Sequence, residues 1–345
     1  MGLIRNSVND MEGYVPGEQP DDPDIVKLNT NENPYPPSPK VIEALKRLDA
    51  DRIRLYPNPV SSELRDRVAV IHGCRTENVF VGNGSDEVLA LCTRAFVEND
   101  GLIGYLDPSY SLYPVLADIR EVEKKTVPLN EDFSWDIPSD FEASLFMLTN
   151  PNAPTGLLAS KSKIREFCKS FSKVVLVDEA YVDFASEDCV ELALSMENVL
   201  VARTLSKSYS MAGLRVGYVI GHKNLIEALY KIKDSYNIDM ISQALALAAL
   251  SDVEYMKSNA ARIIATRERL SEKLTALGWT VIPSNTNFLW VRPVDVTAKD
   301  LFERLRNVGI LLRYFDGERT GDYLRITIGT DEEIDKLIDY VKSNA

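Results

Sequence analysis

The chain has 345 residues, of which 45% are hydrophobic and 26% are charged. This length and balance fit a globular protein of about two domains and exclude disordered, collagen-like and coiled-coil classes. Its 52 acidic side chains outnumber its 39 basic ones, so the formal net charge is −13. Because this charge repels phosphate backbones and anionic lipids, neither a nucleic acid nor a membrane is an expected partner.

The cysteines and the N-terminal sequence indicate a cytoplasmic protein. The four cysteines lie far apart and form no CxxC pair, so neither a metal site nor a disulfide framework is predicted. Residues 1–15 include acidic side chains and no apolar run of signal-peptide length. No apolar stretch elsewhere approaches the roughly 20 residues that a membrane span requires.

Prolines are frequent in the first part of the chain. Seven of them lie between residues 16 and 39, and proline fits neither a helix interior nor a central strand. We therefore predict that residues 1–40 form an extended arm together with part of a small domain.

Short β-rich runs alternate with amphipathic helical stretches from about residue 78 to residue 221. This alternation predicts a mainly parallel sheet with helices on its faces, and we assign residues 41–255 to this large domain. An apolar-periodic stretch over 241–277 predicts a long helical connection to a smaller α+β domain at 256–345. The elements predicted there are strands at 287–291, 310–313 and 323–328, and helices at 298–308 and from 331 onward.

A glycine-rich turn follows the first predicted strand of the large domain. Ligands of open parallel sheets bind beyond the carboxyl ends of the strands. Gly82-Asn83-Gly84-Ser85-Asp86 lies at such an end, before a helix, where free backbone N–H groups can hold a phosphate. The turn matches the dinucleotide motif GxGxxG only in part, because Glu87 replaces the third glycine. A nicotinamide or flavin site and a simple tight turn both remain open.

Further strand ends carry reactive side chains. Asp178 follows an apolar run and could either pair with a cationic ring nitrogen or cap the next helix. Lys207 stands among hydroxyl side chains, a setting that favours Schiff-base chemistry, and Arg215 lies between glycines that would let a phosphate approach. Pyridoxal 5′-phosphate needs all these groups together: a lysine, a carboxylate, a phenol such as Tyr181, and a phosphate site.

Several segments resemble those of the fold-type I aminotransferases. They are DEAY at 178–181, TLSKSYSMAGLRVGY at 204–218 and NPNAPTG at 150–156. The segments at 13–17, 31–34 and 323–330 narrow the resemblance to the histidinol-phosphate aminotransferases. This resemblance implies an α/β fold, that of the fold-type I pyridoxal-phosphate-dependent transferases, with a mainly parallel sheet flanked by helices and a smaller α+β domain. It also implies a homodimer with shared active sites.

The resemblance implies a function for each matching residue. Lys207 would bind the aldehyde carbon of pyridoxal 5′-phosphate, Asp178 would hold its pyridinium nitrogen, and Tyr181 would bond its phenolic oxygen. Tyr110 would stack on the ring. The phosphate would be surrounded by Ser85, Asp86, Thr204, Ser206 and Arg215, and by Tyr56 from the partner subunit.

One position departs from the family pattern. The residue before Pro-Thr-Gly is usually an asparagine whose amide bonds the phenolic oxygen, and Ala153 stands there in this chain. Asn152, one position earlier, is a candidate replacement. Without a replacement the phenolate loses a hydrogen bond worth about 1.5 to 3 kcal/mol, and the pKa of the lysine–cofactor linkage should rise.

The resemblance also implies the substrates. L-Histidinol phosphate and 2-oxoglutarate would give imidazole-acetol phosphate and glutamate, a step of histidine biosynthesis. The pocket must then accept a phosphate or a carboxylate at one place. Arg313 and Arg325 suit both anions because a planar guanidinium forks onto either, although each could instead form a surface ion pair. Tyr14, on the arm, would add a hydroxyl from the other subunit.

Three other functions fit much of the same pattern. They are a threonine-phosphate decarboxylase, a broad aromatic amino acid aminotransferase, and a cofactor-holding protein without activity. Release of carbon dioxide identifies the first, and indifference to a substrate phosphate identifies the second. An absorption spectrum that no amine changes identifies the third.

Overall fold

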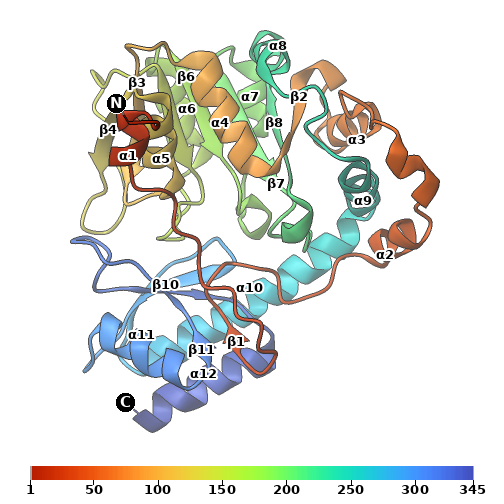
Figure 1. The fold of residues 1–345 in the computed structure, drawn as a ribbon. Coiled ribbons are helices and arrows are strands. Elements are labelled where there is room, and N and C mark those ends of the chain that lie inside the picture. Colours follow the sequence, from red (N-terminus) through yellow and green to blue (C-terminus); the bar gives the residue numbers. More distant parts are fainter. Residues whose placement is uncertain (1, 345) are drawn as a thin grey trace.

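The computed structural model describes residues 2–344 and contains a large α/β domain next to a smaller α+β domain (Figure 1). The predicted fold class, a mainly parallel sheet with helices plus a smaller α+β unit, is confirmed. The exact boundaries at residues 40 and 255 stay a prediction. Within residues 2–344, no helix combines the length and the apolar character needed to cross a membrane.

The large domain is built on one seven-stranded sheet. Its strand order is β2-β8-β7-β6-β5-β3-β4, and β8 alone runs antiparallel to its neighbours. The carboxyl ends of the parallel strands therefore meet at one edge, which faces the smaller domain. The strands are β2 (Val79–Asn83), β3 (Leu102–Asp107), β4 (Glu123–Pro128), β5 (Leu145–Thr149), β6 (Val174–Asp178), β7 (Val199–Thr204) and β8 (Val216–Gly221).

Helices cover both faces of this sheet. Side chains alternate along β5, so Leu145 and Met147 join one hydrophobic cluster while Phe146 and Leu148 join another. Burial on both faces explains why the strands are continuously apolar. The first cluster includes α4 (Gly84–Phe96), α5 (Leu112–Arg120) and α8 (Lys223–Ile232), and the second includes α6 (Lys161–Ser170) and α7 (Val190–Ser195). Three further helices pack together beside β2: α2 (Pro39–Lys46), α3 (Ser62–His72) and α9 (Met240–Leu250).

The smaller domain has a four-stranded antiparallel sheet in the order β12-β13-β10-β9. The long helix α10 (Val253–Ala276) connects it to the large domain (Figure 1). Its other elements are β9 (Thr280–Ile282), β10 (Phe288–Arg292), α11 (Ala298–Asn307), β12 (Arg313–Tyr314), β13 (Leu324–Thr327) and α12 (Asp331–Asn344).

Two predicted elements of this part are divided. The helical stretch expected over 241–277 is interrupted, because Asp252 has a non-helical φ of −132° between α9 and α10. The strand expected over 310–313 is two short strands with different partners. The first, β11 (Ile310–Leu311), pairs with the arm, whereas β12 pairs with β13.

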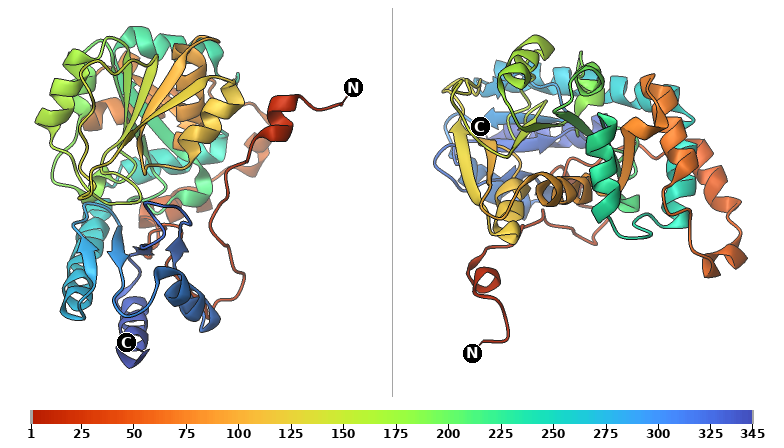
Figure 2. Two further views of the ribbon diagram at one scale, coloured as in Figure 1. Left: turned by 90° about the vertical axis from the view of Figure 1, so that its left-hand side faces the viewer. Right: turned by 90° about the horizontal axis from the view of Figure 1, so that it is seen from above.

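The N-terminal arm joins the two domains along the outside of the molecule (Figure 2). It begins with a short helix, α1 (Asn6–Asp10), that precedes the prolines and lies near α5. It then descends to the smaller domain, where β1 (Val26–Lys27) pairs in parallel with β11. The remaining helical turns are η1 (Ala50–Arg54), η2 (Thr76–Asn78), η3 (Val182–Phe184) and η4 (Ala212–Leu214).

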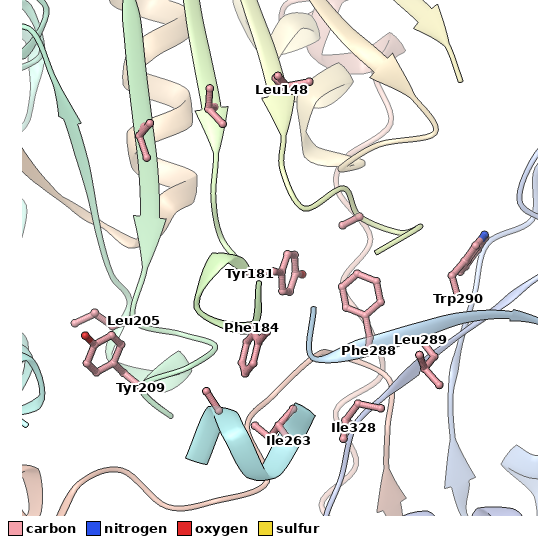
Figure 3. Packing of buried hydrophobic residues seen from close by; sticks show 14 of the residues in the cluster. Leu148, Tyr181, Phe184, Leu205, Tyr209, Ile263, Phe288, Leu289, Trp290 and Ile328 are labelled. Carbon is pink, nitrogen blue, oxygen red and sulfur yellow. The ribbon is translucent and has the colours of Figure 1, made fainter. Parts of the chain in front are cut away.

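The hydrophobic core is continuous between the two domains. Tyr181 and Phe184, which follow β6, pack in the same cluster as Ile263 of α10 and Phe288 of β10 (Figure 3). The rings of Tyr181 and Phe288 meet edge to face, with centroids 5.1 Å apart. This contact holds the strand ends of the large sheet against the smaller domain.

Candidate active site

A pocket lies between the carboxyl ends of the large sheet, the arm and the smaller domain. All but two of the residues predicted for the site line it, although they are spread over residues 14–325 of the chain. They are Tyr14, Ser85, Asp86, Tyr110, Asp178, Tyr181, Thr204, Ser206, Lys207, Arg215, Arg313 and Arg325. The two exceptions are Asn152 and Tyr56.

Asp178 ends β6 at the bottom of the pocket and is 3% exposed. Its Oδ2 accepts a hydrogen bond from the Tyr113 hydroxyl at 3.0 Å, and its Oδ1 accepts the Ala180 N–H at 3.2 Å. Burial raises the pKa of Asp178 to about 6, and these two hydrogen bonds oppose the rise. No cationic side chain of residues 2–344 forms an ion pair with this carboxylate. A protonated ring nitrogen would supply the missing partner.

Lys207 lies three residues beyond the end of β7 and points into the pocket. Its Nζ donates to the carbonyl oxygen of Thr30 at 3.2 Å, so the arm holds the amine in place. Burial, and after it the charge of Arg325, lowers the pKa of Lys207 to about 8. A larger fraction of this amine is therefore neutral near pH 7 than in a free lysine, as nucleophilic attack requires.

The start of α4 forms an anion site with the end of β7. Helix α4 begins at Gly84, directly after β2, and its first N–H groups have no partner within the helix. Gly217 on β8 allows the start of α4 to lie close against this strand, since a Cβ there would be 2.5 Å from the Ser85 nitrogen. Hydroxyls of Thr204 and Ser206 lie 3.0 Å apart beside it. This arrangement can hold a phosphate.

Arg215 completes the anion site from the turn before β8. Its Nη1 reaches the Ser206 Oγ at 3.4 Å, and its Nη2 pairs with the Asp86 carboxylate at 3.0 Å. Asp86 also accepts a hydrogen bond from the Tyr110 hydroxyl at 3.2 Å. Asp86 thus links the arginine of the anion site to the aromatic ring predicted to stack on the cofactor.

Asn152 does not line the pocket, whereas Ala153 does. The Asn152 amide is buried and donates to the Pro108 carbonyl oxygen at 3.2 Å and to the Thr155 hydroxyl at 2.9 Å. Its carbonyl oxygen accepts from Ser109 at 3.3 Å. Because the side chain is engaged in holding its own loop, it does not replace the missing donor at position 153.

The arm and the smaller domain supply the other side of the pocket. Arg325 on β13 donates to the Asn29 carbonyl oxygen at 3.0 Å, and its guanidinium carbon lies 5.4 and 5.3 Å from the ring centroids of Phe288 and Phe315. Arg313 donates to the carbonyl oxygens of Val15 and Pro16 on the arm, at 2.9 and 3.3 Å. Neither arginine forms an ion pair with another side chain of residues 2–344, which was the alternative for it.

Tyr14 and Tyr56 differ in where the chain places them. Tyr14 lines the pocket of its own chain, 6.1 Å from the ring of Tyr110, rather than reaching it from the other subunit as predicted. Tyr56 is 79% exposed, lies outside the pocket and stacks on Tyr236 with ring centroids 4.4 Å apart. The expected contact of Tyr56 with the partner subunit's phosphate site stays a prediction.

Several residues at the site were not predicted from the sequence. Tyr113 and Thr149 support Asp178, with their hydroxyl oxygens 2.5 Å apart. Asn29, Thr30 and Asn31 line the pocket from the arm. The segment 31–34 contributed to the resemblance, but no local pattern shows that Asn31 would face the pocket. Tyr113 lies three residues after Tyr110, in the first turn of α5, and this short spacing was the one available signal.

The pocket fits pyridoxal 5′-phosphate on its own geometry. The amine of Lys207, the uncompensated carboxylate of Asp178 and the anion site at α4 match the aldehyde, ring nitrogen and phosphate of that molecule. Arg325 has a buried Nε without a hydrogen-bond partner among residues 2–344. A buried donor of this kind calls for an acceptor, and a bound anion would provide one.

The comparisons with known proteins agree with this geometry. The model for the aminotransferase class I and II family matches residues 23–341, and the chain belongs to this family. Within it, the chain belongs to the histidinol-phosphate aminotransferases. The protein of that name from Clostridium botulinum (strain Langeland) is 45% identical, over 98% of this chain and 97% of its own length. The one from Rippkaea orientalis is 42% identical with the same coverage.

A solved structure gives the same result. The histidinol-phosphate aminotransferase of Sinorhizobium meliloti in complex with pyridoxal-5′-phosphate superimposes with a TM-score of 0.89 at 25% identity. The match covers 100% of this chain and 99% of that one. The predicted fold-type I aminotransferase and its narrower family are confirmed.

Proposed function

We propose that the chain binds pyridoxal 5′-phosphate and transfers the amino group of L-histidinol phosphate to 2-oxoglutarate, giving imidazole-acetol phosphate and glutamate in histidine biosynthesis. The observation that carries the proposal is a pocket in which Lys207 and Asp178 face an anion site at α4 and a second cation, Arg325. Two anion sites are what a phosphorylated cofactor and an anionic substrate require together.

The residues of the large domain would hold the cofactor. Ser85, Thr204, Ser206 and Arg215 would bind its phosphate, Asp178 would keep its ring nitrogen protonated, and Tyr110 would stack on its ring. When bound, the cofactor supplies an aldehyde that accepts the amino group and a ring that accepts electrons. The Lys207 amine would remove a proton from the substrate carbon that carries nitrogen, and its lowered pKa favours this step.

Arg325 would recognise the substrate anion. Its Nε is buried, and contacts with Asn29 and two aromatic rings hold the guanidinium in one orientation. The N–H groups of a fixed guanidinium can donate to the oxygens of a phosphate monoester or of a carboxylate at the same place. This explains how one pocket serves the amine donor and the keto acid in turn. Arg313 and Tyr14, on the arm side, would close around the same anion.

The absorption spectrum of the purified protein tests this function. Addition of L-histidinol phosphate without a keto acid is expected to remove the visible band of the lysine-bound cofactor and to produce an amine-form band. Subsequent 2-oxoglutarate should restore the first band. The Lys207→Ala variant is the matched control and should show neither change. A band that histidinol phosphate leaves unchanged contradicts the substrate, and carbon dioxide released from threonine phosphate would indicate a decarboxylase.

We infer that the protein is a homodimer whose subunits share their sites. Exposed apolar side chains lie in the same part of the chain as Tyr56, at Ile42, Leu45, Ile53, Leu55 and Val60, and at Tyr236, on which Tyr56 stacks. Exposed apolar groups of this extent are typical of a protein interface. Burial of this surface in a dimer would bring Tyr56 to the partner subunit's phosphate site.

Mixed dimers test the shared site. Lys207→Ala and Tyr56→Ala subunits are each expected to be impaired alone. Dissociated and reassociated together, they should recover up to one intact site per mixed dimer, because one site combines Lys207 of one chain with Tyr56 of the other. A mixture with no more activity than its components contradicts the proposal.

We also infer a cytoplasmic location. The four cysteines, Cys74, Cys92, Cys168 and Cys189, are free thiols. Cysteine side chains stay in the thiol form in a reducing compartment. Cell fractionation checks this, with recovery in the membrane or periplasmic fraction as the contrary result.

A further inference from the structure

Asn31 is a buried amide that the proposed function leaves without a task. It lines the pocket from the arm and is 1% exposed. Its φ of 55° lies in the left-handed region, which asparagine tolerates better than most residues. The Asn287 amide donates to its carbonyl oxygen at 2.9 Å, so the backbone is fixed from the smaller domain.

Hydrogen bonds also fix the side chain of Asn31. The Thr327 hydroxyl accepts the Asn31 backbone N–H at 2.9 Å and donates to the Asn31 Oδ1 at 3.1 Å. With the oxygen of the amide facing Thr327, the Nδ2 faces the other way. It donates to the Tyr181 hydroxyl oxygen at 2.9 Å. The orientation of the amide therefore follows from its partners.

This bond determines where the Tyr181 hydroxyl can donate. Because its oxygen accepts from Asn31, its hydrogen has to point elsewhere, and the pocket lies on that side. The Tyr181 ring cannot turn away, since Phe288 packs against it at 5.1 Å. The charged groups that face Tyr181 are Asp178, Asp86, Lys207 and Arg325. All of them line the same pocket.

The need for such a fixed donor arises from Ala153. A methyl group at this position cannot donate a hydrogen bond, and the Asn152 amide is bonded within its own loop. We propose that Asn31 is a positioning residue, which directs the Tyr181 hydroxyl to the phenolic oxygen of the cofactor and so takes over the function of the amide absent at position 153. The inference rests on the proposed cofactor but not on the proposed substrate.

The pKa of the lysine–cofactor linkage, read from the visible absorption of the holoenzyme against pH, measures this effect. A donor to the phenolate stabilises its charge and lowers that pKa. Asn31→Gly removes the amide without straining the left-handed backbone. We expect the pKa to rise by about 0.5 to 1 unit, against about 1 to 2 units for Tyr181→Phe.

A second variant tests the direction of the hydrogen bond. Asn31→Asp keeps the size and the backbone preference but replaces the donor with an acceptor, which would draw the Tyr181 hydrogen toward itself. In this variant the pKa of the lysine–cofactor linkage should rise more than it does in Asn31→Gly. Asn287→Ala is the matched structural control, because it loosens the backbone of Asn31 and leaves the amide in place. Asn287→Ala should shift the pKa of the linkage by less than half as much as Asn31→Gly does.

Ala153→Asn then tests the substitution of one amide for the other. Introduced into the Asn31→Gly protein, it should lower the pKa by more than it does in the natural chain, since the two positions serve one oxygen. Equal effects in both backgrounds would overturn the inference. So would an unchanged pKa in both Asn31 variants, or equal shifts in Asn31→Gly and Asn287→Ala.

The titration needs no substrate, so its outcome is independent of which amine the enzyme uses. Failure of histidinol phosphate to alter the spectrum would refute the proposed function and leave this test standing. Cofactor content and melting temperature, measured for each variant, show that the titrated protein is folded and loaded. If Asn31→Gly binds no cofactor, the comparison of Asn31→Asp with Asn287→Ala decides the question by the same criterion.

Discussion

The two sides of the pocket are built in different ways. On the large-domain side, Asp178, Lys207 and Ser85 each lie within three residues of the end of a strand. On the other side, Asn31 and Thr327 are 296 residues apart in the sequence, and their contact exists only because the two ends of the chain meet. The first side depends on local sequence and a parallel sheet, and the second depends on tertiary pairing.

The chemistry divides along the same line. Groups proposed to hold the cofactor lie at or just beyond the strand ends of the large sheet, where continuous strands hold them rigidly. Groups suited to the substrate, Arg325, Arg313 and Tyr14, lie on the smaller domain and on an arm with short elements. A pocket divided in this way can change its substrate while keeping its cofactor, and four experiments test that division.

Lys207→Ala should give the largest effect, because it removes both the covalent attachment and the proton transfer. We expect kcat to fall about 10⁴-fold or more, while melting temperature changes little. Steady-state assay of glutamate formation measures it. Activity within a hundredfold of the natural enzyme would mean that the large-domain side does not carry the chemistry.

Arg203→Ala tests whether the rigidity of that side comes from buried charge. The Arg203 Nε donates to the Glu179 carboxylate at 3.0 Å, and the Glu179 side chain has no exposure. Removing the cation leaves this carboxylate without its partner and should lower the free energy of unfolding by about 3 to 4 kcal/mol. Arg165→Ala, which breaks an ion pair with the half-exposed Glu191, is the control and should cost less than about 1 kcal/mol in denaturant unfolding.

Arg325→Ala tests the smaller-domain side. Loss of a charge-assisted contact of about 2 to 3 kcal/mol should reduce kcat/KM for the phosphorylated substrate about 30- to 150-fold. The loss should be much smaller for an amine without an anionic group. Arg292→Ala, on the neighbouring strand β10 and exposed, is the matched control. Equal losses for charged and uncharged amines would show that Arg325 acts on the fold and not on the anion.

The pH dependence of cofactor uptake gives the smallest effect. The neutral amine attacks the aldehyde, and the pKa of Lys207 is lowered to about 8. Its neutral fraction therefore increases with pH through that value, and uptake by the cofactor-free protein should accelerate about tenfold between pH 7 and pH 9. Stopped-flow absorbance measures the rate. An uptake midpoint near the 10.5 of an ordinary lysine would contradict the burial of this amine.

How much the sequence predicts follows the same division. The alternation of strands and helices identified the large sheet, and rules for strand ends selected Asp178, Lys207 and Arg215 before any family was considered. The residues around Asn31 could not be found in this way, because their hydrogen bonds link the arm to strands near the other terminus. Asn152 was a reasonable candidate by position, but the turn of its loop directs the amide to Pro108.

The parallel pairing of β1 with β11 also bears on how the enzyme is made. Strand β11 begins at residue 310 and Thr327 ends β13. During synthesis the arm therefore leaves the ribosome long before β11 and β13, its partners in the smaller domain. Until Thr327 leaves the ribosome, Asn31 lacks this hydrogen-bond partner. A fragment that ends before residue 310 would keep the pocket residues of the large domain. It could not form the other side of the pocket, because β11 and β13 would be missing. Synthesis itself thus imposes an order, in which the side of the pocket suited to the substrate is completed after the residues of the large domain have been made.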